Sequence, residues 1–152
     1  MEFKIRSIGT VVNSRRELQD DFWGSVVSEI LLDSDIPEES LDSIQSFSHL
    51  EIFYIFHKAL ESPIVIGSEH PRENKLWPKV GIFAQRKKNR MNHLGATIVE
   101  LQEVKGRSVF VRNLDAIDGT PIIDIKPVMK EFLPLSEVRQ PDWATELMKN
   151  YW

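Results

Sequence analysis

The sequence predicts an all-β fold, a compact β-barrel with short helices and one C-terminal helix, formed as a single domain over residues 1–152. Three observations support this prediction. Short apolar and β-branched segments recur along the chain, and turns containing glycine or proline separate them. Extended helical periodicity is confined to the end of the chain. Neither a Gly-x-Gly-x-x-Gly nor a Walker-type loop is present, which argues against a Rossmann domain or a P-loop.

The first half of the chain contains three segments with the character of strands. Residues 3–12, 25–32 and 49–56 are rich in β-branched, aliphatic and aromatic side chains, and we expect a strand in each. Between the second and the third, Asp35 and Pro37 are typical of a helix start, with aspartate as the cap and proline in the first turn. This helix must be short, because the third strand follows closely.

Turn residues divide the second half into further strands. Lys105-Gly106-Arg107 joins two of them in a plausible hairpin, and Asp118-Gly119 turns the chain into the last one, which Pro127 ends. The short apolar runs and strands expected here are 64–66, 80–83, 96–104, 108–114 and 122–125.

The last residues have a helical pattern. Asp142 is a capping residue, and Trp143, Leu147 and Met148 follow at helical spacing, with Tyr151 further on. The apolar face of this helix needs a surface to cover. That surface is either the chain's own barrel or a second copy of the chain.

The composition excludes several classes of protein. The chain has 152 residues, of which 41% are hydrophobic, enough for one core. It contains no cysteine, which excludes disulfides and thiolate ligands, and its four histidines are scattered, so we expect no metal site. No stretch approaches the roughly 18 apolar residues of a membrane span, and no signal peptide is recognisable. We expect a soluble, cytoplasmic protein with no membrane partner.

The net charge of −4 hides an uneven distribution. Residues 17–51 contain ten acidic residues and no lysine or arginine, whereas residues 52–152 contain fifteen basic and twelve acidic residues. The second part is therefore positive, which leaves room for an anionic partner.

The first of three stretches with chemical character is the strand over 49–56, with His49 at its start and His57 and Lys58 after its end. In an ideal strand the two histidines lie roughly 26 Å apart, so they cannot both contact one small ligand unless the strand bends. His57 stands where the apolar run ends, a position typical of the mouth of a barrel. The alternative is a core strand whose histidines bond only to backbone.

The second stretch runs from the apolar segment 80–83 into a basic loop that returns at Gly95. An arginine at the end of a strand, such as Arg86, is well suited to pair with a carboxylate or phosphate. We expect Arg86 to be rigid, whereas Lys87 and Lys88 should be mobile. An ordinary solvated charge run is the alternative. The basic and amide residues of the loop are Arg86, Lys87, Lys88, Arg90 and Asn92.

The third stretch places charged residues at the ends of two apolar strands. It contains Asp115, the turn Asp118-Gly119-Thr120-Pro121, and Asp124 and Lys126. An Asp-Gly turn is common in hairpins, so the turn by itself indicates little.

Taken in order, the three stretches resemble the TsaA-like (TrmO-like) S-adenosylmethionine-dependent tRNA methyltransferase family. The resemblance covers about two thirds of the chain, including its opening Ile8-Gly9. It rests on Phe47-Ser48-His49-Leu50 with His57, on Gly81–Arg86 with Arg90, Asn92 and Gly95, and on Asp118–Pro121 and Asp124–Pro127.

The resemblance implies an all-β barrel that binds S-adenosylmethionine and forms a homodimer. It also implies methyl transfer to the N6 nitrogen of threonylcarbamoyladenosine, beside the anticodon of a tRNA. The cofactor contacts that it implies are His57, Lys58, Arg86, Ala96, Asp118, Gly119, Thr120 and Pro121. As expected substrate contacts we add Lys87, Lys88, Arg90, Asn92, Asp124 and Lys126.

Chemistry assigns roles to a few of these residues. The methionine carboxylate favours a cation such as Arg86, and the positive sulfonium favours carboxylates or carbonyls. Asp118, Asp124 or a backbone carbonyl of the turn is expected to accept a hydrogen bond from the target amino group. The sequence identifies no catalytic base.

The chain also departs from the family pattern. Lys87, Lys88 and Met91 replace the serine and prolines of the family's loop, and Gln19–Trp23 stands where the family has a proline-arginine-glutamine segment of the cofactor site. Longer members add a small C-terminal domain thought to help hold tRNA, which we expect this chain to lack. Two alternatives follow: a methyltransferase of this fold acting on a small molecule or another modified base, and a non-catalytic barrel that binds the cofactor or RNA.

Overall fold

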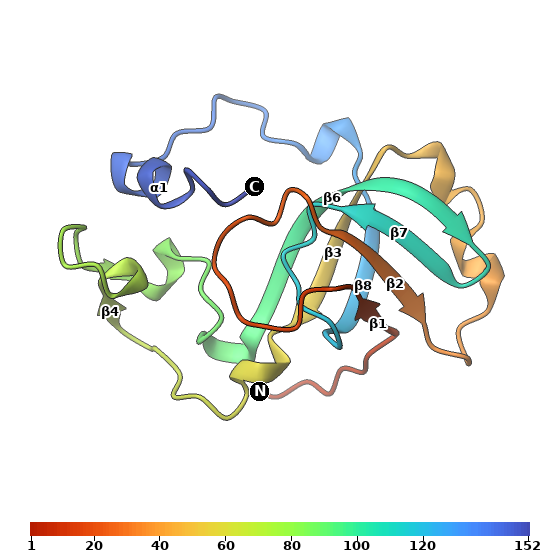
Figure 1. Cartoon of the computed structure of the whole chain (residues 1–152), viewed down its shortest axis with the longest axis horizontal. Coiled ribbons are helices and arrows are strands. Elements are labelled where there is room, and N and C mark those ends of the chain that lie inside the picture. Colours follow the sequence, from red (N-terminus) through yellow and green to blue (C-terminus); the bar gives the residue numbers. More distant parts are fainter.

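The computed structural model describes residues 1–152 and contains a closed six-stranded antiparallel barrel (Figure 1). The order around the barrel is β1-β2-β7-β6-β3-β8, so the first and last of these strands also pair. The all-β barrel predicted from the sequence is therefore confirmed. The strands are β1 Gly9–Val12, β2 Val27–Leu32, β3 His49–Ile55, β6 Leu94–Lys105, β7 Ser108–Arg112 and β8 Pro121–Pro127.

Alternation along the strands fills the barrel with apolar side chains. In β3, Leu50, Ile52 and Tyr54 are buried, while the residues between them are more exposed. This period of two is what a strand with one face toward a core requires. The other strands add to the same core Val11, Ile30, Leu32, Val99, Val109, Val111 and Ile122, and Leu41, Leu114 and Ala116 complete it from outside the strands.

Two irregularities in the ladders bend the barrel. The pairing of β3 with β8 shifts register between Phe53 and Tyr54, and the pairing of β6 with β7 shifts between Leu101 and Glu103. Such bulges bend a strand and re-aim its side chains. The first one lies immediately before the end of β3, where the candidate site begins.

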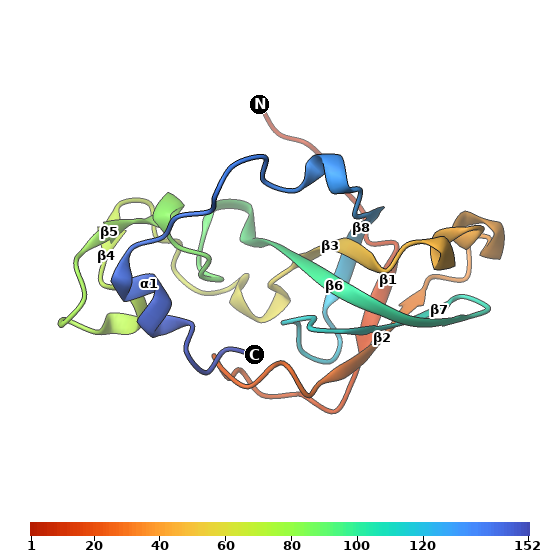
Figure 2. The same ribbon diagram turned by 90° about the horizontal axis from the view of Figure 1, so that it is seen from above.

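A smaller lobe, residues 56–93, lies at one end of the barrel together with α1 Asp142–Leu147 (Figure 2). Its only sheet pairs β4 Ser68–Glu69 with β5 Val80–Gly81. The remaining turns are short 3-10 helices. In the whole chain these are Glu38–Leu41, Ile44–Ser46, His57–Ala59, Pro71–Glu73, Ile82–Ala84, Met91–His93 and Lys130–Phe132.

Several expected elements differ in the structure. The first strand begins at Gly9 and not at residue 3, because its partner β2 ends at Leu32, opposite Gly9. Asp35 caps no helix; it pairs with Arg6 at 2.9 Å, and the nearby 3-10 helix begins after Pro37 without a side-chain cap. Residues 64–66 form no strand.

The apolar strand expected over 80–83 is only the two residues of β5, because Ile82–Ala84 form a 3-10 helix before the basic loop. The remaining expected elements are present. The hairpin of β6 and β7 turns at Gly106, and Asp118-Gly119 leads into β8, which ends at Pro127. The final helix is also present, although Asp142 lies in its first turn and makes no capping hydrogen bond. None of the helices combines the length and apolar character needed to cross a membrane. No three histidine or acidic side chains are grouped as metal ligands.

Candidate functional site

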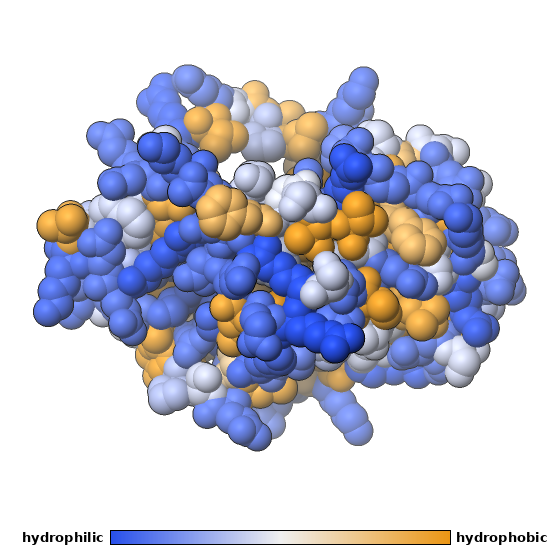
Figure 3. Space-filling view, viewed as in Figure 1, coloured by the Kyte–Doolittle hydropathy of each residue, from blue (hydrophilic) through white to orange (hydrophobic).

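A cleft of about 1010 Å³ opens where the mouth of the barrel meets the smaller lobe. We call it the mouth cleft. Hydrophilic side chains cover most of the face seen in Figure 3, and apolar side chains show in patches near its middle. Residues from five parts of the chain line the cleft. They include Gln19, Asp20 and Trp23 of the N-terminal segment, Tyr54 and Phe56 to Ala59 with Ala96 and Thr97, Ala84 to Asn89 of the basic loop, Asp115 to Ile117, and Trp143, Leu147, Met148, Tyr151 and Trp152.

Asp115 is the centre of a hydrogen-bond network in this cleft. Its Oδ1 accepts hydrogen bonds from the Tyr54 hydroxyl, at 2.8 Å, and from the Thr97 hydroxyl. Its Oδ2 accepts one from the Tyr151 hydroxyl. Two of the donors stand on barrel strands and are buried, whereas the third belongs to the end of the chain. A carboxylate held by three hydroxyl groups is fixed in place and keeps its acceptor character.

Local sequence explains how Tyr54 reaches this carboxylate. Gly95 lies opposite Tyr54 in the pairing of β3 with β6, and a Cβ atom at Gly95 would overlap the Tyr54 ring. The absence of a side chain therefore lets the ring lie flat against β6. Phe56 packs against it edge-on, with ring centroids 5.3 Å apart. The glycine and the bulge before Tyr54 together direct its hydroxyl toward Asp115.

The network changes the acidity of both tyrosines. Burial raises the pKa of Tyr54 well above its usual value, and the charge of Asp115 raises it further. Burial also raises the pKa of Tyr151, again with Asp115 as the second cause, while Arg86 and Arg72 oppose the shift. Both hydroxyl groups are therefore protonated at neutral pH and act as donors.

The turn at residues 118–121 is fastened to β1. The amide of Gly119 donates to the carbonyl of Val11 at 2.8 Å, and the amide of Val11 donates to the carbonyl of Thr120 at 2.9 Å. Gly119 has a φ of +80°, which favours glycine. A Cβ atom built there would lie 4.0 Å from His57 Nε2, so the turn and the end of β3 are neighbours. The stretch that ends at His57 and Lys58 and the turn at residues 118–121 are therefore adjacent in the structure.

His57 is neutral over a wider pH range than a free histidine. Burial lowers its pKa from 6.5, and the neighbouring charge of Lys58 lowers it further. Lys58 itself donates to the carbonyl of Arg16 at 2.8 Å.

The basic loop forms another wall of the cleft. The guanidinium of Arg86 donates to the carbonyl of Ala96 on β6. Lys87 pairs with Glu69, and only 30% of its side chain is exposed. The expectation of a loose, solvated lysine therefore fits Lys87 poorly, because the smaller lobe supplies a carboxylate for it. Lys88 lines the cleft without such a partner.

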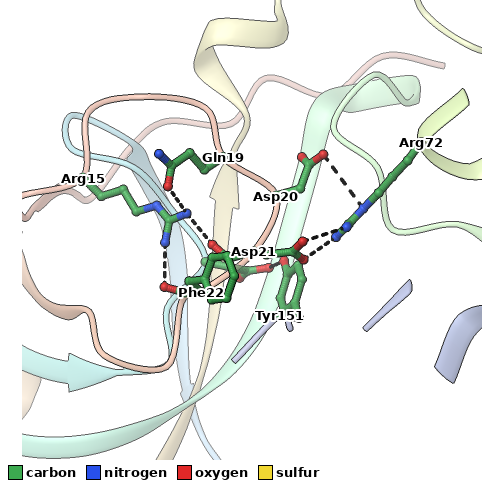
Figure 4. A network of polar contacts seen from close by, with 8 residues as sticks. Arg15, Gln19, Asp20, Asp21, Phe22, Arg72 and Tyr151 are labelled. Carbon is green, nitrogen blue, oxygen red and sulfur yellow. Dashed lines mark hydrogen bonds and ion pairs between the residues drawn. The ribbon is translucent and has the colours of Figure 1, made fainter. Parts of the chain in front are cut away.

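The N-terminal segment, residues 15–23, is tied to the smaller lobe and to the end of the chain (Figure 4). Arg72 binds both carboxylate oxygens of Asp21, at 2.7 and 3.0 Å. Arg15 donates to Gln19 and to backbone carbonyls of the segment, and its guanidinium lies 3.9 Å from the centre of the Trp23 ring. This is the stretch that matched no family motif, and it forms part of the cleft wall.

The final segment, residues 142–152, crosses the cleft; we call it the strap. Two backbone hydrogen bonds hold its end, from Phe22 to Asn150 at 2.9 Å and from Trp23 to Tyr151 at 2.8 Å. Its helix is tied to the smaller lobe by a 2.8 Å hydrogen bond from Trp77 Nε1 to Glu146. The strap thus packs on its own chain, and the apolar stripe is no longer an argument for a dimer.

The structure brings half of the residues predicted from the sequence into the cleft. Asp118, Gly119 and Pro121 form the adjoining turn without lining it, and Arg90 and Asn92 lie further along the loop, where Arg90 donates to Gln85 at 2.9 Å. The predicted residues that line the cleft are His57, Lys58, Arg86, Lys87, Lys88, Ala96 and Thr120.

The expected acceptor carboxylates do not face the cleft. Asp118 accepts from the Asn13 amide at 3.1 Å and pairs with Arg16, and Asp124 pairs with Lys126 on β8. Asp115 holds that place instead. The sequence alone does not distinguish Asp115 as an acceptor, because its partners Tyr54, Thr97 and Tyr151 are far apart along the chain.

The sequence of the chain is similar to those of known methyltransferases and S-adenosylmethionine-binding proteins. Residues 16–132 match the family described as the tRNA-methyltransferase O N-terminal domain. The chain is 34% identical over 138 residues to a probable S-adenosyl-L-methionine-binding protein of Methanothermobacter thermautotrophicus, covering 86% of this chain and 93% of that protein. It is 35% identical over 105 residues to a human tRNA (adenine(37)-N6)-methyltransferase, covering 69% of this chain but 23% of the human protein.

The fold is shared with solved structures. A crystal structure of TrmO from Pseudomonas aeruginosa superimposes with a TM-score of 0.73 at 21% identity, over 94% of this chain and 62% of that one. A second structure of TrmO from the same organism gives a TM-score of 0.73 at 23% identity. The chain therefore spans less than two thirds of the length of these structures and about a quarter of the human relative.

Proposed function

The chain belongs to the family of the tRNA-methyltransferase O N-terminal domain, and from this we propose that it binds S-adenosylmethionine in the mouth cleft and methylates an adenosine of tRNA. The observation that carries the proposal is the position of Asp115, a carboxylate fixed by hydrogen bonds that lines the same cleft as the cations of the basic loop. The names of the relatives support the cofactor and the substrate class.

The residues of the cleft fit the cofactor. Its volume of about 1010 Å³ is at the upper end for small-molecule sites, which leaves space beside the cofactor for a base. Arg86 provides a cation for the methionine carboxylate, and the aromatic side chains Trp23, Phe56 and Trp143 provide apolar surface for an adenine ring. We propose His57, Lys58, Arg86, Ala96 and Thr120 as cofactor contacts in the cleft, and Asp118, Gly119 and Pro121 as contacts from the adjoining turn, which does not itself line the cleft. When bound, S-adenosylmethionine supplies an electrophilic methyl group on a positively charged sulfur.

Asp115 is the proposed acceptor for the hydrogen bond, and then the proton, of the target nitrogen. An exocyclic adenine nitrogen is a weak nucleophile because its lone pair is delocalised into the ring. We propose that Asp115 accepts a hydrogen bond from the N6–H group and takes up this proton as N6 becomes alkylated. The hydroxyl groups of Tyr54 and Thr97 hold the carboxylate in position, so little reorganisation accompanies the reaction.

We propose the N6 nitrogen of threonylcarbamoyladenosine, next to the tRNA anticodon, as the target. Lys87, Lys88 and Arg90 stand along one side of the cleft and its loop, where phosphate groups of an RNA are attracted. Asn92, Asp124 and Lys126 lie outside the cleft and are proposed only as contacts to more distant parts of the RNA. We further propose a single domain over residues 1–152, a cytoplasmic location and a homodimer.

Calorimetry with S-adenosylmethionine tests the cofactor, and we expect a micromolar dissociation constant. Arg86→Ala should weaken this binding at least about tenfold, with little dependence on salt. Mass spectrometry of nucleosides in tRNA from a deletion strain tests the substrate; the expected result is loss of the methylated adenosine. A flat titration with folded protein contradicts the proposal. Cofactor binding with unchanged tRNA nucleosides would favour a small-molecule substrate.

A further inference from the structure

The two oxygens of Asp115 are held differently. Oδ1 accepts from Tyr54 and Thr97, both of which stand on strands of the barrel and are buried. Oδ2 accepts from Tyr151. Oδ1 is therefore bonded to two residues of the barrel wall, whereas the only side-chain donor to Oδ2 belongs to the strap.

The strap is attached in a way that permits displacement. Residues 129–141, which connect β8 to it, are all exposed, so none of them is anchored in the core of the barrel. Its helix has six residues and no capping side chain. The helix is held by the Trp77–Glu146 hydrogen bond, and the far end by the backbone hydrogen bonds to Phe22 and Trp23 and by Tyr151 on Asp115. None of the residues 142–152 is fully buried, and short segments of this kind open at lower free energy than the strands of a core.

We propose that Tyr151 occupies the position of the substrate donor, and that the N6–H group of the target adenosine replaces the Tyr151 hydroxyl on Asp115 Oδ2. The inference rests on the proposed function and names its specificity element. A hydroxyl donor on this partly buried carboxylate oxygen is displaced most readily by another donor, because leaving the oxygen unpaired is unfavourable. A nucleobase without an N–H at this position does not complete the exchange, so the strap stays in place and the target is rejected.

The Tyr151→Phe variant tests the exchange directly. It removes the competing hydroxyl and keeps the ring that packs edge-on to Trp152, with centroids 5.0 Å apart. The KM for tRNA should fall by about tenfold, since hydrogen bonds to charged groups are among the strong ones, while kcat and the affinity for S-adenosylmethionine stay unchanged. The assay uses unmethylated tRNA from a deletion strain and methyl-labelled cofactor.

Two further variants make the test specific. Thr145→Val removes an exposed hydroxyl from the same strap, at a residue that does not line the cleft and that accepts from Gln140 at 2.9 Å, and should change neither constant. Asp115→Asn should lower kcat by about a hundredfold or more, as does loss of one preorganised group in other enzymes. When Tyr151→Phe is combined with Asp115→Asn, it should no longer lower the KM for tRNA, because its effect depends on the carboxylate of Asp115.

Hydrogen exchange provides a readout that does not need turnover. The amides of Phe22 and Trp23, which donate to the strap, should exchange faster when tRNA is bound than when only cofactor is bound. A KM that is unchanged or raised in Tyr151→Phe, or a fall in kcat, overturns the exchange while normal turnover of the unaltered chain upholds the proposed function. Absence of methyl transfer by the unaltered chain overturns both.

Discussion

The backbone amide of Trp23 donates a 2.8 Å hydrogen bond to the carbonyl of Tyr151. This bond joins the N-terminal segment to the strap directly behind the hydroxyl that occupies Asp115. The Trp23 side chain is buried, with 4% of its surface exposed, and the guanidinium of Arg15 stacks on its ring. The N-terminal segment and the strap therefore form one wall of the mouth cleft together.

Trp23→Ala should lower the free energy of unfolding by about 3–5 kcal/mol, because it removes a buried aromatic side chain and leaves a cavity. Chemical denaturation followed by circular dichroism measures the change. Phe22→Ala is the matched control, since the Phe22 side chain is 65% exposed and its backbone bond to Asn150 is kept. Equal effects of the two substitutions would show that Trp23 has no special part in this wall.

Gly95→Ala should destabilise the protein by about 1–3 kcal/mol and lower methyl transfer. The added Cβ atom overlaps the Tyr54 ring, so the ring must move and its hydroxyl loses the 2.8 Å bond to Asp115. Gly81→Ala provides the comparison, because a Cβ atom there meets nothing within 4 Å. Thermal unfolding and methyl-transfer assays of both variants measure the difference. A Gly95→Ala protein as active and as stable as Gly81→Ala would refute the close-packing argument.

The two lysines of the loop should contribute unequally to tRNA binding. Lys88→Ala should weaken binding and reduce the slope of log K against log salt by about one unit, as expected for loss of one phosphate contact. Lys87→Ala should have a smaller effect, because Glu69 already pairs with its charge. Filter binding at several salt concentrations measures both, with exposed Lys79→Ala as the control. Identical slopes in all three variants would mean that the loop is merely solvated.

His57 should titrate below 6.5, its usual pKa. Burial disfavours the charged imidazolium, and Lys58 adds repulsion, so Lys58→Gln should move the midpoint partly back. Between the lowered pKa and 6.5 the unfolded chain binds more protons than the folded one, and stability therefore falls as the pH drops through this window. Proton NMR of the imidazole gives the midpoint, and His57→Gln should lack the acid-dependent loss. A midpoint at or above 6.5 would contradict this account.

The barrel could be predicted from the sequence because its determinants are local. Alternation in 49–56, glycine at the 105–107 turn and the Asp-Gly turn each specify a strand or hairpin without reference to distant residues. The extension of the first strand to residue 3 was wrong because a strand also needs a neighbour, and β2 ends opposite Gly9.

The site was only partly predictable. His57 and Arg86 could be selected because each follows an apolar run in the sequence, and the structure places both in the cleft, although the run before Arg86 ends in a 3-10 helix and not in a strand. Asp115 could not be distinguished from Asp118 or Asp124 in the sequence, since only the closed barrel brings Tyr54, Thr97 and Tyr151 to the first of the three.

The seam between β1 and β8 has a kinetic consequence. It contains only two residue pairs, Gly9 with Ile122 and Thr10 with Pro121, and the hydrogen bonds of Gly119 and Thr120 to Val11 extend it. Because the two strands lie more than a hundred residues apart in the chain, their pairing must follow the hairpins and carries a large loop-closure entropy. In a chain emerging from the ribosome, β1 can pair with β2 but has no second partner until the turn at Asp118 and β8 have been made. Synthesis of the turn and of β8 therefore completes the barrel wall and one border of the cleft in the same late step.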